Sequence, residues 1–498
     1  MLRSGLIIIF TLLVSKILAL LRESLLAFYY GASYIVDAYI IAISLPTVLF
    51  SMFASGISNS YIPISLQIHS EYKRKSFFKS IILIVLIISF VVSLFCYFYS
   101  YNIAMILAPG FKDKSLELTS SFIKVVSFYL PCFSVFNIFS AHLASVFDFA
   151  FSNFCNNIVT NFFICLSVYL SISNTLILMY GYVFSIVFVT FLLGFYLIKI
   201  DRRIFNAEIR LLDENVLKLV KSAIPLGFSV LTNQINGVVD RVFSSELGEG
   251  ITSVLSYANR IQLMPYSLVI SALVSIFVPK ISKAFADDNL ASAEYYTKKS
   301  INLVLFLSMP CFFFILLFSE DIVRILLQRG QFDINTTSMT SVALILYSVS
   351  IPFYSLREIA TRVLSAKLFN KIILRNTLMS ICFNILFNVI FVRYLGFKGL
   401  PIATSLSGIL ACLLMFCSIR EKKLYTFCRA DILELMKIFS SCVLSYIICI
   451  SLYSLIESKL VYSLILMLFY FIIYILSSFI FKVEVSTYLL IKFKIIKK

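Results

Sequence analysis

Long apolar runs with almost no charged residues are the feature that most restricts how this chain of 498 residues can fold. A membrane-spanning helix needs about 20 apolar residues, and runs of that kind recur along the whole sequence. Only 13% of the residues are charged and 60% are hydrophobic, whereas soluble domains have about 25% charged residues. The sequence therefore predicts an all-α polytopic membrane protein with about 14 transmembrane helices.

The connections between the predicted helices are short, and none is long enough for a large soluble domain. The predicted helices cover residues 5–29, 36–60, 77–107, 122–146, 156–173, 176–199, 223–243, 253–279, 301–318, 339–364, 373–393, 399–419, 436–456 and 460–481. With an even number of spans, both termini are expected on the same side of the membrane.

Basic residues are divided unevenly between the two sets of connections. The connections on the side of the termini contain 28 Lys and Arg residues, and those on the opposite side contain 7. Because cytoplasmic loops of membrane proteins are enriched in Lys and Arg, both termini are expected in the cytoplasm. Contact of these loops with anionic lipid accounts for the net charge of +17, so we expect no nucleic-acid partner.

Two distant segments share a spacing of charges and prolines. Arg22 precedes Pro46 by 24 positions, and Arg241 precedes Pro265 by the same number. Chance similarity between apolar segments is the alternative, but the coinciding charges and prolines favour a parallel internal repeat, which is typical of transporters. We expect an N-terminal six-helix lobe over residues 1–220, a second six-helix lobe over 221–434, and two further helices with a basic tail over 435–498.

Motifs for covalent chemistry are absent from the sequence. It contains no GxxxxGK[ST] phosphate loop, no HExxH or GxSxG motif, and no CxxC pair. The 11 cysteines are scattered through the apolar runs, where they behave as small hydrophobic residues. These observations favour movement of a substrate over catalysis, and they predict neither a cofactor nor a metal site.

Ionisable residues inside the predicted helices cluster where each repeat begins. They are Lys16, Arg22, Glu23 and Asp37 in the first repeat, and Asp240, Arg241 and Arg260 in the second. A charge at the bilayer centre costs about 2.5–3.5 kcal/mol on insertion scales, so this set favours a water-filled cavity. Cations outnumber acids, and an arginine can make two hydrogen bonds to a phosphate, so the cavity is expected to attract an anion.

The spacing of these charges also predicts which of them pair. Adjacent residues on a helix do not face each other, so Arg22 and Glu23 are expected not to pair, and at least one of them should find another partner. The alternative is that the helix is short and the two residues lie at its end. Glu358 and Arg362 are four apart with the acid first, which predicts a local structural pair.

Several stretches together resemble the MviN/MurJ family of lipid II flippases. They are SKILALLRESLLAFYYGASYIVDAYIIAISLP near the N-terminus, LAPGF at 107–111, VVDRVFSSELGEGITSVLSYANRIQLMP, VPKISKAF, LLQRGQFD at 326–333 and GFKGLPIATSLS at 396–407. The resemblance implies two six-helix lobes, a cationic central cavity, and two additional helices that form a groove for a lipid tail. By position it implies that Lys16, Arg22, Glu23, Asp37 and Arg260 line the cavity, and the charge pattern adds Arg241.

The chain departs from the family pattern in the second predicted helix. Phe50, Ser51 and Ser55 stand where the family usually has charged residues, and Asn259 stands where an Asp often precedes the arginine. Losing charges of both signs suggests a rewired gate or a different head group. The departures bear on the substrate more than on the fold.

The expected function is that of a flippase in the bacterial inner membrane, moving lipid II by alternating access for peptidoglycan synthesis. Its expected partners are a lipid-linked diphosphate glycan, membrane lipids and a coupling ion. The first alternative is a flippase for another lipid-linked oligosaccharide, such as an O-antigen or capsule unit. A third interpretation, a cation-coupled drug antiporter, is disfavoured because such a protein would prefer an acidic cavity. A membrane scaffold that transports nothing is also disfavoured, because it would not need matched charges in both repeats.

Overall fold

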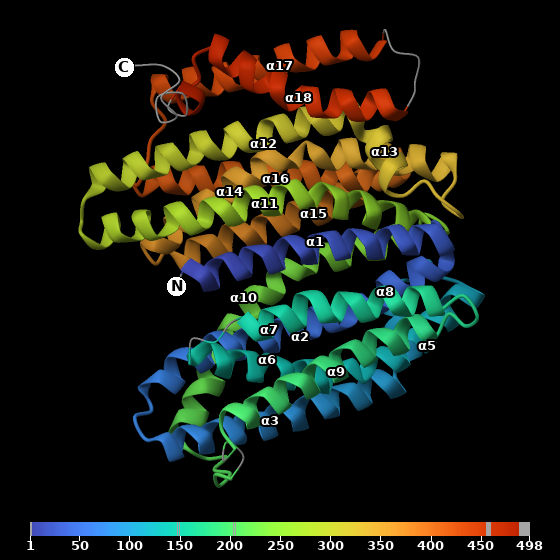
Figure 1. Ribbon diagram of the computed structural model, residues 1–498, viewed down its shortest axis with the longest axis vertical. Coiled ribbons are helices and arrows are strands. Elements are labelled where there is room, and N and C mark those ends of the chain that lie inside the picture. The colour runs from blue at the N-terminus through green and yellow to red at the C-terminus, as the bar shows by residue number, and fades with distance from the viewer. Residues whose placement is uncertain are drawn as a thin grey trace. The chain divides into compact units, whose positions relative to one another are not determined.

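The computed structural model describes residues 2–146, 148, 150–202, 204, 206–454 and 460–487, and its regular structure there is helical (Figure 1). The helices are α1 (Leu2–Tyr30), α2 (Tyr34–Gln67), α3 (Glu71–Phe98), α4 (Ser100–Leu107), α5 (Asp113–Ser127), α6 (Tyr129–Ser145), α7 (Ala150–Phe154), the π-helix η1 (Cys155–Val159), α8 (Thr160–Leu170), α9 (Ile177–Ile200), α10 (Glu214–Ser245), α11 (Ile251–Ala286), α12 (Leu290–Leu326), α13 (Ile334–Ser348), α14 (Ser350–Ala366), α15 (Asn370–Leu395), the 3-10 helix η2 (Gly396–Lys398), α16 (Gly399–Glu421), α17 (Arg429–Ser454) and α18 (Leu460–Ile480).

The apolar runs and the observed helices coincide. Each predicted span falls on one helix or on two consecutive helices, such as α5 and α6 for residues 122–146. Within the described residues, nine helical stretches are long and apolar enough to cross a bilayer. The prediction of an all-α membrane protein with many apolar helices is confirmed, and the number of 14 spans remains a prediction.

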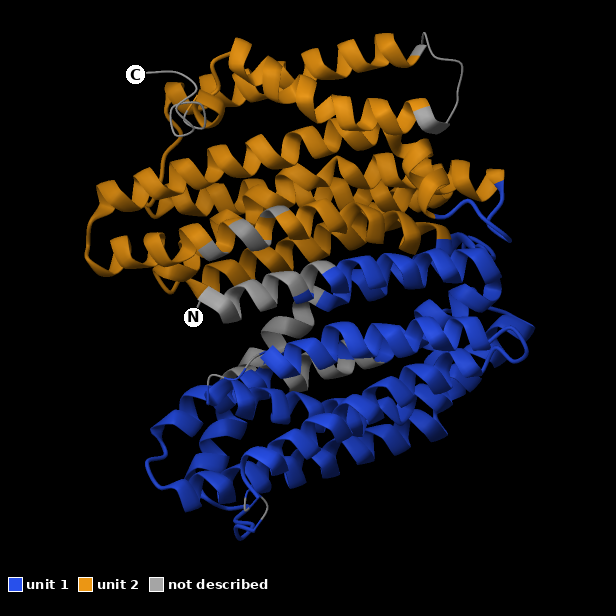
Figure 2. Ribbon diagram, in the orientation of Figure 1, with its two compact units in different colours: residues 1–253, 327–333 blue, residues 254–326, 334–498 orange. Residues whose placement is uncertain are grey.

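The chain forms two compact units (Figure 2). The first contains residues 1–253 and 327–333, and the second contains 254–326 and 334–498. The first unit extends beyond residue 220 because α10 packs along α2. The three-part division expected from the sequence remains a prediction.

Helix α2 is central to the first unit. It packs against α5, α6 and α10, while α1 packs against the broken helix formed by α7, η1 and α8. Residues 36–42 of α2 are buried without interruption, as expected of a helix that is covered on all sides.

A proline helps to attach the last helix to the second unit. Pro310 lies inside α12 and has no N–H, so it cannot donate to the carbonyl of Phe306, four residues earlier. The Tyr474 hydroxyl of α18 donates to that carbonyl oxygen at 2.8 Å. The Tyr470 hydroxyl donates to the carbonyl oxygen of Pro310 itself at 3.2 Å. The contact of α18 with α12 thus satisfies a backbone acceptor that the proline leaves without its helical donor.

Two glycines at equivalent positions of the proposed repeat have the same unusual backbone. Gly31 and Gly250 each lie nine residues after the first arginine of their segment, and their φ angles are +59° and +80°. A Cβ atom on Gly250 would lie 2.6 Å from the carbonyl oxygen of Ala32, and one on Gly31 would lie 2.5 Å from that of Gln331. Both positions require glycine, because a side chain would be strained and would collide with backbone.

Candidate functional site

Arg22 and Glu23 pair with each other on α1, which corrects the expectation that adjacent residues would not. Arg22 Nε and Nη2 donate to Glu23 Oε1 at 3.0 and 2.9 Å. The side chains are 21% and 10% exposed. The long arginine side chain folds around the helix surface, so its planar fork reaches a carboxylate that the helical spacing directs elsewhere.

Arg22 also has a partner far along the chain, as the sequence predicted for at least one member of the pair. Its Nη1 donates to Asn161 Oδ1 on α8 at 3.3 Å. Asn161 Nδ2 in turn donates to the carbonyl oxygen of Asn157 at 2.7 Å, which fixes the orientation of the amide. Arg22 uses three of its five N–H donors in these contacts, so the guanidinium can bind an anion without releasing its partners.

Asn161 is a partner of Arg22 that the sequence pattern did not identify. It follows the π-helix η1, and Thr160 Oγ1 donates to the carbonyl oxygen of Cys155 across that bulge at 3.2 Å. Single-turn π-bulges occur often at functional sites. The one signal in the sequence was the polar run of Asn156, Asn157, Thr160 and Asn161 inside an apolar segment.

Asp37 lies fully buried in the first turn of α2, where it contacts the beginning of α11. Its carboxylate accepts hydrogen bonds from the backbone N–H of Gly250 at 2.6 Å and of Ser253 at 2.7 Å. The hydroxyl of Ser253 donates to the same carboxylate. A negative charge at this position stabilises the N-terminus of a helix. The role of Asp37 as a cavity residue remains a prediction.

The remaining predicted cavity residues are half-buried. Lys16 lies on α1, two turns before Glu23, and Arg241 lies on α10 next to Asp240. Arg260 lies on α11 within the second compact unit. Their assignment to a substrate cavity stays a prediction.

Two further predictions from the sequence concern a local ion pair on α14 and the uncharged residues of α2. Glu358 and Arg362 form the predicted local pair, with Arg362 Nε donating to Glu358 Oε1 at 2.9 Å. Phe50, Ser51 and Ser55 belong to α2, and the predictions made for all three concern side chains outside those that the structure describes.

Among the residues that the structure describes, no group of three or more His, Cys, Asp or Glu side chains is arranged to hold a metal ion. The arrangement around Arg22 is instead suited to holding an anion. It presents a guanidinium whose orientation is fixed by a carboxylate on its own helix and by an amide on α8.

Comparison with known proteins identifies a family that matches most of this chain. The model of the family described as lipid II flippase MurJ matches residues 26–482. The chain is 27% identical over 422 residues to a probable lipid II flippase MurJ of Rickettsia prowazekii (strain Madrid E), covering 82% of this chain and 81% of the relative. It is 28% identical over 416 residues to the corresponding protein of Aquifex aeolicus (strain VF5), covering 82% and 81%.

Solved structures show the same fold. A lipid II flippase MurJ in an inward closed conformation superposes with a TM-score of 0.85 at 23% identity, covering 97% of this chain and 100% of that chain. An inward-facing multidrug resistance MATE family transporter of the MOP superfamily superposes with a TM-score of 0.69 at 15% identity, covering 82% and 95%. The two neighbours share the helical architecture of this chain.

Proposed function

The chain belongs to the MurJ family of lipid II flippases, and we propose that it moves lipid II, the undecaprenyl-diphosphate-linked peptidoglycan precursor, across the bacterial inner membrane. The observation that carries this proposal is the match of the family model to residues 26–482. In this proposal the protein is a transporter without catalytic chemistry, and both termini lie in the cytoplasm, where the richly basic connections face anionic lipid.

The proposed substrate contacts centre on the diphosphate. Arg22 and Arg260 bind its oxygens, assisted by Lys16 and Arg241, because guanidinium and ammonium groups match the charge and geometry of phosphate. Glu23 keeps the guanidinium of Arg22 in a fixed orientation, and Asn161 holds it from α8. A preoriented arginine loses less conformational entropy when the substrate binds.

Alternating access is the proposed mechanism, with the head group in a watery cavity and the lipid tail in the bilayer. The contact of Asp37 with the beginning of α11 serves as a latch that opens and closes during the cycle. The membrane potential supplies about 2.3 kcal/mol per unit charge per 100 mV. A coupling ion is a further proposed partner, and Glu23 and Asp37 are its candidate sites.

A flippase for another lipid-linked oligosaccharide is the second candidate function. Phe50, Ser51 and Ser55 favour it, because these uncharged residues occupy positions at which the family resemblance leads us to expect charges. An O-antigen or capsule unit carries the same diphosphate with a different sugar, so the contacts of Arg22 would be retained.

Depletion and rescue tests the proposal. The host's own lipid II flippase is depleted, and this chain is expressed in four forms: wild type, Arg22→Ala, Arg22→Ala/Glu23→Gln and Arg362→Ala. The double variant neutralises Glu23, because a buried carboxylate without its partner would by itself be strongly destabilising. Arg362→Ala removes an arginine from a local pair and is the matched control.

We expect the wild type and Arg362→Ala to restore growth, and both Arg22 variants to fail although they accumulate in the membrane. Full rescue by Arg22→Ala would contradict the role of that residue. Failure of a stably inserted wild type would favour the second candidate, which is then tested in cells that lack an O-antigen or capsule flippase.

A further inference from the structure

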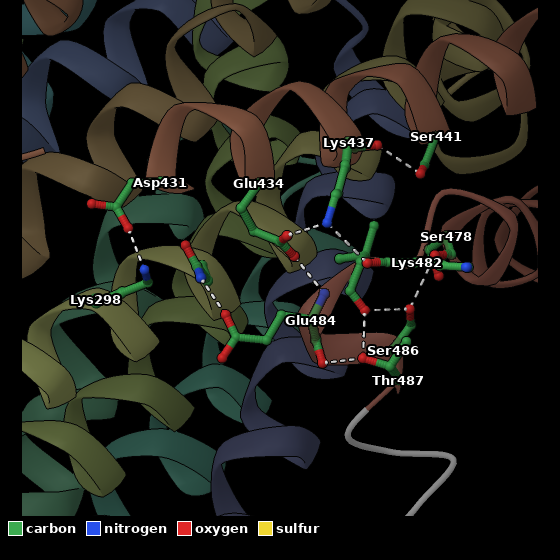
Figure 3. Close-up of polar contacts among 12 residues, drawn as sticks. Lys298, Asp431, Glu434, Lys437, Ser441, Ser478, Lys482, Glu484, Ser486 and Thr487 are labelled. Atoms are coloured by element: carbon green, nitrogen blue, oxygen red, sulfur yellow. Dashed lines mark hydrogen bonds and ion pairs between the residues drawn. The ribbon is translucent and has the colours of Figure 1, made fainter. Parts of the chain in front are cut away.

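A cavity of about 640 Å³ lies in the second unit, where α12 and α17 meet the residues that follow α18. Figure 3 shows the polar contacts around it. Its lining includes Lys298, Glu434, Lys437, Phe481, Lys482 and Glu484. The volume is within the range of small-ligand sites. None of these residues is among the proposed contacts to the diphosphate, and all lie near helix ends on the side that the distribution of basic residues predicts to be cytoplasmic.

The carboxylates of the cavity already have donors within the chain. Glu434 accepts from Lys437 Nζ at 3.3 Å and from the backbone N–H of Glu484. Glu484 accepts from Asn302 Nδ2 at 3.1 Å. Asp431, beside the cavity, accepts from Lys298 Nζ at 2.7 Å. A cation entering the cavity would therefore compete with existing hydrogen bonds.

The lysines have more donors than these contacts use. An ammonium group has three N–H groups. Lys298 Nζ contacts the carboxylate of Asp431, and Lys437 Nζ contacts Glu434 and the carbonyl oxygen of Lys482 at 3.3 Å each. The two side chains remain 32% and 42% exposed. Both can donate to an anion while keeping the contacts that position them.

The side of the cavity formed by α17 is apolar and open. Leu433 and Met436 line it and are 53% and 61% exposed. In a membrane protein, exposed apolar side chains at a helix end lie against acyl chains, with the head groups just beyond. The cavity therefore combines donors for an anionic group with an apolar wall for the chain attached to it.

We propose that this cavity binds the phosphodiester head group of an anionic membrane phospholipid such as phosphatidylglycerol. Basic pockets between helices on the cytoplasmic side are suited to such head groups. Lys298, Lys437 and Lys482 are balanced by Glu434, Glu484 and the adjacent Asp431, so the anion would be held by the unused N–H donors of the lysines and not by an excess of positive charge. A diphosphate would bring at least one more negative charge close to Asp431, Glu434 and Glu484, so the head group of lipid II fits this cavity less well.

Lipid binding to the purified full-length chain in detergent tests the proposal by native mass spectrometry. The probes are phosphatidylglycerol, phosphatidylethanolamine and undecaprenyl diphosphate, each titrated separately. The variants are Lys437→Gln, Lys437→Arg and Lys298→Gln/Asp431→Asn, the last of which removes both charges of that ion pair. Lys299→Gln is the matched control, because Lys299 is the next residue along the helix and its Nζ lies over the ring of Tyr295 at 4.5 Å.

We expect the parent, Lys437→Arg and Lys299→Gln to bind phosphatidylglycerol equally well. Lys437→Gln and Lys298→Gln/Asp431→Asn should bind it about tenfold more weakly, as for the loss of one hydrogen bond to a charged group. Retention by Lys437→Arg shows that a cation is needed at this position, and an unfolding midpoint of Lys437→Gln equal to that of the parent excludes misfolding as the cause. Equal binding by Lys437→Gln and the parent would overturn the proposal. Weakened binding of undecaprenyl diphosphate with unchanged phosphatidylglycerol would also overturn it and assign the cavity to the substrate.

Discussion

Asp37 accepts hydrogen bonds from the backbone N–H and the hydroxyl of Ser253, although 216 residues separate the two in the chain. Helix α11 begins immediately after Gly250, which has no side chain with which to cap it. The carboxylate of Asp37 supplies the missing acceptor, and its negative charge faces the positive end of the helix dipole. One residue of α2 thus fixes where α11 begins.

Replacing Asp37 by Asn should lower the free energy of unfolding by about 1–2 kcal/mol. The amide has no charge, and its NH₂ group would face the N–H and O–H donors of Gly250 and Ser253. Thermal unfolding in detergent measures the change. Glu249→Gln is the control, since the Glu249 carboxylate lies exposed in the turn before α11 and accepts from the backbone N–H of Tyr34 at 3.2 Å. An unchanged midpoint for Asp37→Asn would show that the latch contributes little.

Replacing Asn161 by Ala should weaken lipid II binding about tenfold, the amount expected when one hydrogen bond to a charged group is lost. Arg22 keeps its bonds to Glu23 but loses its anchor on α8. Titration of lipid II onto the purified protein measures the affinity. Asn157→Ala is the control, because Asn157 holds Asn161 through a backbone carbonyl that the substitution retains. Equal effects of the two substitutions would remove Asn161 from the proposed site.

Replacing Gly250 by Ala should destabilise the first unit by more than about 1 kcal/mol, since the new Cβ would strain a positive φ and collide with the carbonyl oxygen of Ala32. Gly248→Ala separates the two causes, because Gly248 has a φ of +117° and a Cβ added there would have no atom within 4 Å. Thermal unfolding and growth rescue are the readouts. We expect Gly250→Ala to be the more damaging, and the reverse order would contradict the packing argument.

Replacing Tyr474 by Phe should cost about 0.6 kcal/mol, the average for a hydrogen bond between membrane helices, and at most about 1.7 kcal/mol. The hydroxyl donates to the Phe306 carbonyl, to which Pro310 cannot donate because it has no N–H. Tyr470→Phe is the control, because the Pro310 carbonyl that it contacts can still accept from its own helix. Chemical unfolding in detergent compares them. A larger loss for Tyr470→Phe would mean that ring packing, rather than the proline, governs this contact.

The sequence predicted the features that depend on local spacing. Apolar runs located the helices, and the four-residue interval from Glu358 to Arg362 predicted a pair that the structure contains. The pairing of Arg22 with Glu23 was predicted wrongly, because helical spacing describes where Cβ atoms point and not how far a flexible arginine can reach. Side-chain length decided that contact.

Local spacing could not predict contacts between segments that are distant in the sequence. Asn161 meets Arg22 across 139 residues, and its position depends on a π-bulge that no apolar periodicity reveals. Asp37 was recognised as an unusual charge, but its hydrogen-bond donors, at Gly250 and Ser253, depend on how the first turns of α2 and α11 meet in space. Composition and periodicity carry no information of that kind.

The hydrogen bonds between Asp37 and Ser253 can form only after both residues have been translated. At a synthesis rate of about 5–20 residues per second, some 10–40 s pass between translation of the acid and translation of its donors. During that interval α2 enters the membrane with a carboxylate in its first turn that still lacks these donors. Residues 327–333 of the first unit emerge later still. The first unit therefore matures only after residues 254–326 of the second have been translated.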